Sequence, residues 1–585
     1  MKELWTRVKN EITPEKIVVR AIMAWLVTAI LFYSRIFIKF NTPEFAQSIN
    51  IVMYVCFMVL FFCFFCGLGA LNVFSWMDVY GPMILITVYG TLTVSENSDV
   101  AYVVGIMAVL AIAIFYAVSK TKEFVVIKRT WIVKAIYVIA GGFYLWVVGS
   151  ITVFRYICYS SPAYDFGIWA QMFHYMKTRF VPATTVERSR LLSHFAVHFS
   201  PIYYLFLPVY MIFPYPATLQ ILQAVTLASG IVPVYLLCKR RGLTNSATAA
   251  FGILFALFPA LATGCYYDLH ENCFLTPLIL WLFYFIEKDD MRGIVIFSIL
   301  TMLVKEDAPV YVACIGLYVI FGKSKPVKGA IVTVMAIVYF CVVTSLMKRY
   351  GLGIMATRYD NYGSSLFDVI KNFLTNPAYV IRECFKSSKY TFIVYMLMPL
   401  GFLPVISKHV SRYILIIPML LVNLATDYQY QYNIFFQYTF GVIAILFYLA
   451  IINYSDFSEK ARRFMCAFAL CATILIMPVC SLSRTYMYDV YKNSRENIEL
   501  LDNMVGRIPK DASVSASTFL VPHLADRDVL YEYPGYYSHD DLTDYVILDN
   551  RNSRITDEVR DELKRKGYVL SESIEKLYEV YRLDK

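Results

Sequence analysis

Charged residues are scarce in this sequence: Asp, Glu, Lys and Arg make up 16% of its 585 residues, whereas 59% are hydrophobic. Soluble globular proteins carry about 25% charged residues, so the composition excludes a chain that is soluble as a whole. Gly (25) and Pro (22) are too few for a collagen-like chain, and a 17% aromatic content argues against disorder. The sequence therefore indicates a protein with many membrane-spanning segments.

Cysteine patterns typical of disulfides or metal sites are also lacking. Most of the 13 cysteines lie in apolar stretches, and residues 482–585 contain none. Cys63 and Cys66 have Cys-x-x-Cys spacing, but they lie inside an apolar run and are interpreted as packing residues. The N-terminus lacks a short apolar region followed by a cleavage site, so its first apolar run is interpreted as a span.

The charges that are present divide the chain in two. Residues 1–481 carry 38 Lys/Arg and 23 Asp/Glu, whereas residues 482–585 carry 15 and 20. The basic clusters form short loops between apolar runs, which is typical of cytoplasmic loops and not of nucleic-acid binding. The acidic tail is expected to be a small α/β domain, with buried strands at 514–516 and 544–549 and a charged helix at 553–566.

Fifteen spans are expected, with a cytoplasmic N-terminus and an external C-terminus in the cytoplasmic (plasma) membrane. The fold class is thus an all-α polytopic membrane protein with a small extracytoplasmic α/β domain. We expect four extra N-terminal spans in residues 1–130, a transmembrane core in 131–481 with external loops 155–198 and 348–388, and the soluble domain in 482–585. The expected spans lie at about 17–38, 49–71, 79–94, 100–118, 131–154, 217–238, 246–263, 272–287, 293–304, 308–322, 327–347, 389–406, 411–424, 434–453 and 464–481.

Two segments decide this count. The apolar stretch 199–213 is short and rich in proline, so it is interpreted as interfacial. The stretch 293–322 is interrupted by Lys305-Glu306-Asp307, and it forms either one helix with three buried charges or a hairpin with the charges at its outer tip. We choose the hairpin because it keeps every later basic cluster cytoplasmic except the basic loop 348–388.

On this topology the remaining ionisable residues converge on the external side, where a wet cavity would hold them. A structural ion-pair cluster is the alternative. His194 and His198 are spaced i,i+4, so a helix would place both rings on one face. The run Tyr428, Tyr430 and Tyr432 is more typical of an interfacial aromatic belt than of a sugar platform. The converging residues are Asp165, His174, His194, His198, Asp268, His270, Glu271, Lys305, Glu306, Asp307 and Arg358.

Several short motifs then occur in a characteristic order. They are Tyr164-Asp165-Phe166-Gly167 with Gln171, His198-Phe199-Ser200-Pro201, Gln223, Asp268-Leu269-His270-Glu271, Glu306-Asp307, and a tail piece from Val521 to Arg527 followed by Tyr533-Pro534. In this order the sequence resembles the GT-C superfamily of multi-spanning glycosyltransferases. It is most similar to a bacterial and archaeal family of predicted membrane proteins of unknown function related to that superfamily, over roughly residues 131–550.

The resemblance implies an integral-membrane enzyme that moves a hexosyl or pentosyl group from a polyprenyl-phosphate sugar to a cell-envelope acceptor (a glycan, lipid or protein). The acidic residue of the first external loop, Asp165, would be the catalytic base. The division of labour between Asp268 and Glu271 stays open because the second acidic motif reads Asp-Leu-His-Glu here. A transporter or flippase of lipid-linked glycans, or a non-catalytic scaffold, would use the same cavity without chemistry.

The candidate site residues fall into three groups by expected role. Asp165, Asp268, Glu271, Glu306 and Asp307 are candidates for catalysis. His194, His198, His270, Lys305 and Arg358 are candidates for binding the substrate or its phosphate, since cations stabilise charge on a departing phosphate. A divalent cation, Mg²⁺ or Mn²⁺, would use Asp165, Asp268 and His270.

Overall fold

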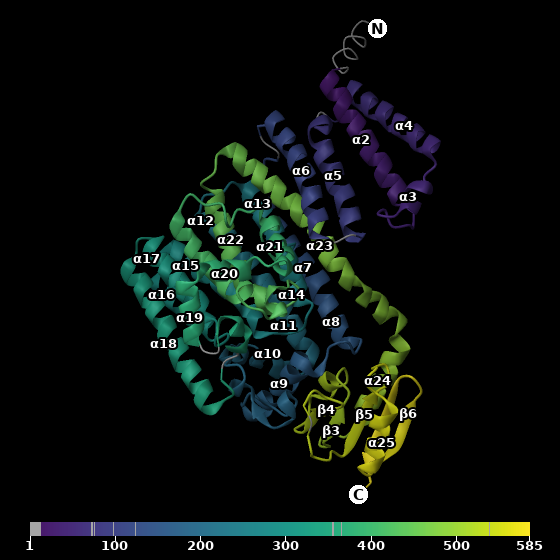
Figure 1. The fold of residues 1–585 in the computed structure, drawn as a ribbon, viewed down its shortest axis with the longest axis vertical. Coiled ribbons are helices and arrows are strands. Elements are labelled where there is room, and N and C mark those ends of the chain that lie inside the picture. Colours follow the sequence, from purple (N-terminus) through teal and green to yellow (C-terminus); the bar gives the residue numbers. More distant parts are fainter. Residues whose placement is uncertain are drawn as a thin grey trace.

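The computed structural model describes residues 13–71, 74, 76–96, 99–122, 125–353, 356–363, 366–537 and 539–584. The basic N-terminal residues expected on the cytoplasmic side fall largely outside these ranges. Figure 1 shows a mostly helical molecule with one small sheet near its C-terminus. Within the described ranges, ten helices are long and apolar enough to cross a membrane, and three shorter apolar helices accompany them. The chain is therefore a multi-span membrane protein.

The expected count of fifteen full-length spans is too high, because ten helices among the described residues are long enough to span a membrane. The five expected spans that fall short are the two halves of 293–322 and the segments 272–287, 389–406 and 411–424. They form helices of only 8–14 residues or irregular turns, because prolines such as Pro309, Pro399 and Pro418 interrupt or start them. Hydropathy counts apolar residues, but only a helix of about 20 residues spans the bilayer.

The N-terminal helices form a separate group beside the long helix α23 (Figure 1). Arg20 of the first helix is 1% exposed and holds Asp78 in a bidentate ion pair, with Nε and Nη2 at 2.9 and 2.7 Å from the carboxylate oxygens. Only Phe65 of the second long helix, Ile51–Ala70, is buried, as expected of a helix that faces lipid. The group comprises α2 (Pro14–Tyr33), α3 (Pro43–Gln47), α4 (Ile51–Ala70), α5 (Met77–Glu96) and α6 (Val100–Lys120).

The central bundle surrounds α22 (Phe440–Tyr454), every residue of which is buried. The next helix, α23 (Glu459–Asn493), crosses the bundle and leads into the C-terminal domain (Figure 1). The other bundle helices are α7 (Thr130–Tyr144), α8 (Ser150–Ile157), α9 (Ile168–Arg179), α10 (Leu207–Ile212), α11 (Pro216–Ser229), α12 (Ile231–Arg240), α13 (Asn245–Ala256), α14 (Pro259–Cys265), α15 (Leu275–Lys288), α16 (Met291–Met302), α17 (Pro309–Phe321), α18 (Pro326–Tyr350), α19 (Leu366–Thr375), α20 (Pro377–Cys384) and α21 (Tyr390–Leu397).

The two ambiguous segments both fold as broken structures. Residues 303–308, which contain Lys305-Glu306-Asp307, separate α16 from α17, so no single helix carries three charges through its middle. The stretch 199–213 contains only a 3₁₀ turn (Pro201–Leu205) and the six-residue helix α10. The backbone N–H of Ile202 donates to the carbonyl of Leu303 at 3.1 Å, so this segment lies against the polar turn.

The basic loops gather at one end of the bundle, which we call the basic face. Its loops are 120–129, 239–245, 287–292, 323–328, 408–412 and 455–463. Lys323 pairs with Glu287 at 2.6 Å, Lys328 with Asp289 at 2.6 Å, and Arg463 donates to the carbonyl of Thr121. The alternation expected from the charge pattern therefore agrees with the structure, since these loops meet on one side.

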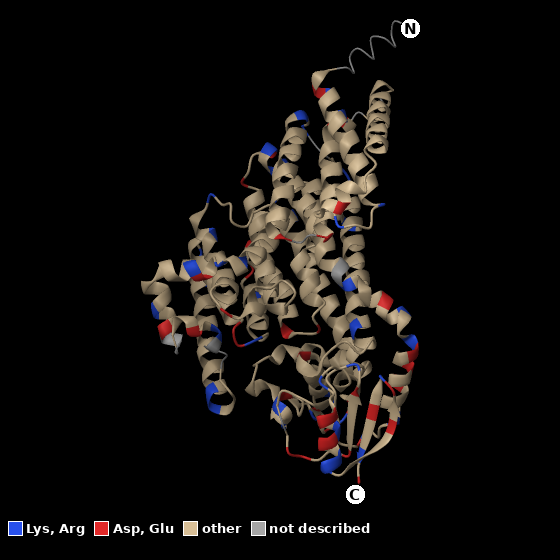
Figure 2. Cartoon of the chain, turned by 45° about the vertical axis from the view of Figure 1, so that its right-hand side comes forward, with Lys and Arg blue, Asp and Glu red and all other residues tan. Residues whose placement is uncertain are grey.

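The C-terminal domain is a mixed five-stranded sheet in the order β4-β3-β5-β7-β6. Both β4 (Leu530–Glu532) and β5 (Tyr545–Asp549) pair in parallel with β3 (Val514–Ala516), whereas β7 (Tyr578–Leu583) is antiparallel to β5 and to β6 (Tyr568–Ile574). Helices α24 (Arg495–Arg507) and α25 (Asp557–Arg565) complete it. Charged side chains are dense here and sparse among the spanning helices (Figure 2), as the composition indicates.

This domain is fastened to the loop 155–198, which also carries a two-stranded sheet of β1 (Ala183–Thr184) and β2 (Leu192–Ser193). Gln171 donates to the carbonyls of Arg527 and Asp528 at 3.2 and 3.3 Å. The His523 ring stacks between Tyr156 and Tyr159, with centroids 4.2 and 3.6 Å apart. Burial lowers the pKa of His523 to about 3, so this ring stays neutral in the stack.

Single cysteines on the two ends of the molecule should react from opposite sides of the membrane. Ser538, the position that the sequence suggests, lies outside the described residues, so the exposed Glu575 in the β6–β7 turn replaces it. In a variant whose exposed native cysteines have been replaced, Glu575→Cys should react with an impermeant maleimide in intact cells. Arg292→Cys, exposed on the basic face, should react only after lysis. Reaction of both from one side would contradict this fold, and reversed reaction would overturn the expected orientation.

Candidate functional site

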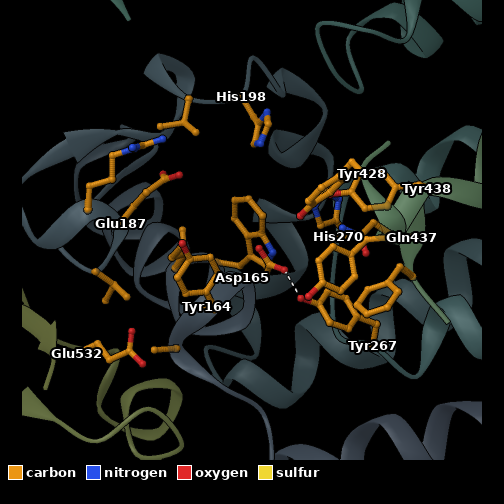
Figure 3. A pocket seen from close by; sticks show the side chains of 18 of the residues that line it. Tyr164, Asp165, Glu187, His198, Tyr267, His270, Tyr428, Gln437, Tyr438 and Glu532 are labelled. Atoms are coloured by element: carbon orange, nitrogen blue, oxygen red, sulfur yellow. Dashed lines mark hydrogen bonds between the residues drawn. The ribbon is translucent and has the colours of Figure 1, made fainter. Parts of the chain in front are cut away.

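A cavity of about 880 Å³ lies where the loop 155–198, the loop after α14, the 358 and 427–438 segments and the C-terminal domain meet. Figure 3 shows Asp165 near its middle, with Tyr267, His270, Gln437, Tyr428 and Tyr438 to one side and Glu187 and Glu532 to the other. The remaining lining residues are Ala163, Tyr164, Ile168, Trp169, Val186, Arg188, Ser189, Val197, His198, Arg358, Asp427, Tyr430, Phe436 and Tyr537.

Asp165 sits on a strained turn between α8 and α9. Its backbone has φ 62° and ψ −76°, close to the γ-turn of positive φ, which is rare and strained. The hydroxyl of Tyr267 donates to Oδ2 of Asp165 at 2.6 Å, and the hydroxyl of Thr518 accepts from the N–H of Ala163 at 3.0 Å. The C-terminal domain thus supports the turn that aims Asp165 into the cavity. Among the described residues, no cation lies within ion-pair distance of this carboxylate.

Arg358 is one of the two arginines that line the cavity, the other being Arg188. The Arg358 guanidinium lies over the rings of Tyr428 and Tyr438, 4.6 and 5.2 Å from their centroids, and Nη2 donates to the Tyr438 hydroxyl at 3.4 Å. Within the described part of the chain it has no carboxylate at ion-pair distance. Two aromatic faces therefore hold a planar, permanently charged donor at the cavity wall, an arrangement suited to an oxyanion.

Glu271 lies behind the cavity wall in a fully buried charge cluster. Its carboxylate is 2.9 Å from Lys305 Nζ and 2.9 Å from His270 Nδ1, and the hydroxyl of Tyr203 donates to it at 2.8 Å. Burial opposes ionisation, but His270 and Lys305 hold the pKa of Glu271 well below its usual range. Glu271 is therefore an ionised structural partner whose oxygens face other side chains.

A second buried pair orients His198. Its Nδ1 lies 2.8 Å from Glu306 Oε1, and the N–H of Phe199 donates to the other oxygen at 3.1 Å. Although burial opposes it, His198 and Lys305 lower the pKa of Glu306 to about 2, so the carboxylate accepts from the ring. Burial raises the pKa of the adjacent Asp307. His198 lines the cavity, whereas Glu306 and Asp307 do not.

Residues 194–196 form a 3₁₀ turn and not the expected helix, but the N–H of His198 donates to the His194 carbonyl at 2.8 Å, and the two rings lie 5.8 Å apart. His194 is fully buried, with Nδ1 2.9 Å from Glu187, and lies outside the cavity lining. Since Glu187 does line the cavity, His194 acts on it from behind. His174 lies farther out, 3.4 Å from Asp528 of the C-terminal domain.

Asp268 is also turned away from the cavity. It accepts from Ser161 and Gln220 at 2.7 and 2.5 Å, and Arg155 Nε lies 3.2 Å from its other oxygen. Burial raises its pKa to about 6, against the opposing effect of Arg155. Gln223, another motif residue, fixes the same loop by donating to the Asp268 carbonyl at 2.8 Å.

These contacts do not fit the expected metal site. Asp268 is engaged by Arg155, Ser161 and Gln220, whereas Asp165 is held by Tyr267 on a different wall. Among the residues that the structure describes, no three His, Cys, Asp or Glu side chains are grouped so as to hold a metal ion. We therefore derive no step through a divalent cation.

Of the expected site residues, the cavity brings together Asp165, His198, His270 and Arg358. Sequence reasoning missed Glu187, Arg188, Glu532 and Tyr537, since nothing local to the sequence indicates that β4 and the loop after it reach this cavity. The tyrosine run was interpreted as an interfacial belt, yet Tyr428 and Tyr430 line the cavity. Nothing in the sequence indicates that Arg358 lies over the rings of Tyr428 and Tyr438, which are 70 or more residues away along the chain.

The model of the family of predicted membrane proteins DUF2079 matches residues 155–582. The chain belongs to this family. No curated protein matches the sequence. Among solved structures, similarity is found to the crystal structure of ArnT from Cupriavidus metallidurans bound to undecaprenyl phosphate. That similarity has a TM-score of 0.47 and 9% identity, over 75% of this chain and 97% of that chain.

Replacement of Glu271 by Gln should destabilise the protein strongly. The change leaves the ammonium of Lys305, 2% exposed, without its ionised partner, and breaking a buried ion pair costs about 3–5 kcal/mol. The midpoint of thermal unfolding in detergent should fall well below that of the surface control Glu575→Gln. A double variant with Lys305→Gln should recover part of the loss. Equal midpoints for Glu271→Gln and the control would contradict this structural role.

Proposed function

We propose that this protein transfers a sugar from a polyprenyl-phosphate donor to an extracytoplasmic acceptor, with Asp165 as the general base. The observation that carries the proposal is that one cavity holds the Asp165 carboxylate and the Arg358 guanidinium, neither of which forms an ion pair with another residue that the structure describes. Base and oxyanion site need this separation, because a direct ion pair between them would quench both. The donor class is taken from the motif resemblance.

The donor phosphate is assigned to the wall that carries Arg358. There the guanidinium, held over Tyr428 and Tyr438, offers planar donors to phosphate oxygens. His270 lines the same side of the cavity (Figure 3). Lys305 lies behind this wall, 6.0 Å from the Tyr438 ring, but its charge is paired with Glu271, so Arg358 supplies the permanent positive charge of the wall. This wall therefore favours the phosphate as negative charge builds up on it.

The acceptor is assigned to the opposite end, against the C-terminal domain. Arg188 donates to the Tyr537 hydroxyl at 3.0 Å and also lies over that ring, while Glu187 and Glu532 contribute carboxylates. Burial raises the pKa of Glu532. Carboxylates and aromatic rings suit a polyhydroxylated acceptor, which they bind by hydrogen bonds and by stacking.

Between these ends, Asp165 would take the proton of the acceptor hydroxyl as the new C–O bond forms at the anomeric carbon. The bond from that carbon to the phosphate oxygen breaks in the same displacement, and its electrons stay on the phosphate. Because the leaving group already carries its charge on phosphate oxygens, no strong general acid is needed. A single displacement inverts the anomeric configuration.

Asp165→Asn should abolish most transfer while the fold survives. Asn has the same shape as Asp and can still accept from Tyr267, but it cannot take a proton. Loss of a general base lowers turnover about 10²–10⁴-fold. The measurement is transfer of radiolabel from polyprenyl-phosphate sugars by the reconstituted protein. The control Glu532→Gln neutralises a carboxylate elsewhere in the cavity and should retain far more turnover. Near-normal transfer by Asp165→Asn would remove Asp165 from this role.

Arg358→Gln should weaken donor binding. A hydrogen bond to a charged group contributes about 1.5–3 kcal/mol, so the KM for the donor should rise about 10- to 100-fold. Arg188→Gln, which removes the same charge from the other end of the cavity, should change the KM for the acceptor instead. The two constants are measured by varying one substrate at a saturating level of the other. An unchanged donor KM in Arg358→Gln would place the phosphate elsewhere.

A further inference from the structure

A second cavity lies on the basic face, at the other end of the bundle from Asp165. Its volume is about 190 Å³. It lies between the C-terminal ends of α12 and α17 and the segment 409–412. Its polar lining consists of Arg241, Tyr318, Lys323, His409, Ser411 and Arg412. None of these residues takes part in the proposed transfer.

Three permanent cations converge here on only two carboxylates. Lys323 lies 2.6 Å from Glu287, and Arg241 reaches the same carboxylate only at 3.8 Å. Arg412 pairs with Asp456. Neither acidic residue lines the cavity, so its walls present positive charge to the interior.

Arg241 is the least satisfied of the three cations. Its Nε atom is buried without a hydrogen-bond partner, and Nη2 donates only to the Ser455 hydroxyl at 3.3 Å. A buried donor of a charged group is costly to leave unpaired, so this atom points to an anionic partner. Ser411 also lines this cavity, and hydroxyl groups can donate hydrogen bonds to phosphate oxygens.

The edges of this cavity are apolar and exposed. Val410, between His409 and Ser411, is 82% exposed, and Phe321, which precedes the lining residue Gly322, is 65% exposed. A free anion would gain nothing from such neighbours, whereas the acyl chains of a lipid would cover them. The cavity also lies where helices leave the membrane, which is the depth of lipid phosphates, and basic pockets at this level are suited to anionic head groups.

We propose that this cavity binds the phosphate of an anionic phospholipid from the leaflet that surrounds the basic face. Arg241 and Lys323 contact the phosphate oxygens, Ser411 donates to them, and Val410 and Phe321 meet the acyl chains. The bound lipid would link the ends of α12 and α17 to the 409–412 segment.

The test compares lipids on purified full-length protein in detergent, with the midpoint of thermal unfolding as the readout, because a ligand that binds only the folded state raises it. Phosphatidylglycerol should raise the midpoint of the wild type, whereas phosphatidylcholine should not. Arg241→Gln should need about tenfold more phosphatidylglycerol for the same shift, the effect of one lost charge-assisted hydrogen bond. Arg240→Gln is the matched control: its neighbouring side chain donates to the Glu287 carbonyl and lies outside the cavity, so its response should stay that of the wild type.

Three outcomes would overturn the proposal. Equal responses of Arg241→Gln and Arg240→Gln would show that any lipid effect arises elsewhere. An equal effect of phosphatidylcholine would show that charge is not recognised. Inorganic phosphate matching phosphatidylglycerol at the same concentration would assign the cavity to a free anion. If Arg241→Gln does not fold, Ser411→Ala replaces it, with the same comparison against Arg240→Gln.

Discussion

The ion pair between Glu271 and Lys305 is the constraint on which the end of the bundle that holds the Asp165 cavity depends. Lys305 follows α16, a helix of only 12 residues, so its charge lies below the end of a full span and must be satisfied inside the protein. Glu271 meets that need from the loop after α14. The pair therefore fixes the depth at which the two loops meet. It also positions two residues of the cavity wall, because His270 precedes Glu271 and His198 contacts Glu306, the neighbour of Lys305.

The C-terminal domain depends on the same end of the bundle. Thr185 and Leu530 exchange two hydrogen bonds, with the Thr185 hydroxyl donating at 2.7 Å and accepting at 2.9 Å, so β4 is joined to the loop that carries Asp165. Gly167 leaves no room for a side chain, since a Cβ there would lie 2.8 Å from Val521. Two of the motifs, around Gly167 and around Val521, therefore form one interface between the loop 155–198 and the C-terminal domain. That interface closes the cavity with Glu532 and Tyr537.

Composition and charge were sufficient to predict a multi-span protein, the gathering of basic loops at one end, the break at residues 305–307 and a small tail domain with strands at β3 and β5. They could not predict how long each helix is, because a proline within an apolar run shortens a helix without changing its hydropathy. They also could not separate ionised structural partners from open groups. Asp268 and Asp165 look alike in the sequence, but Arg155 engages one and only the Tyr267 hydroxyl engages the other.

That difference carries the functional argument. A buried carboxylate that accepts from several donors and pairs with a cation has no free lone pair for a substrate. If it took a proton from a substrate, the cation would lose its ionised partner. Glu271 and Glu306 are in this position, and each is ionised because its partners make it so. Asp165 has one neutral donor and opens to the cavity, so its remaining lone pairs can meet a hydroxyl without breaking a charge pair. Asp268 is also a poor candidate for the base, because Ser161 and Gln220 donate to it and Arg155 lies beside it. The paired residues hold the walls in place, and Asp165, near the middle of the cavity (Figure 3), is a carboxylate without an ion pair to any described residue and lies between the Arg358 wall and the C-terminal domain.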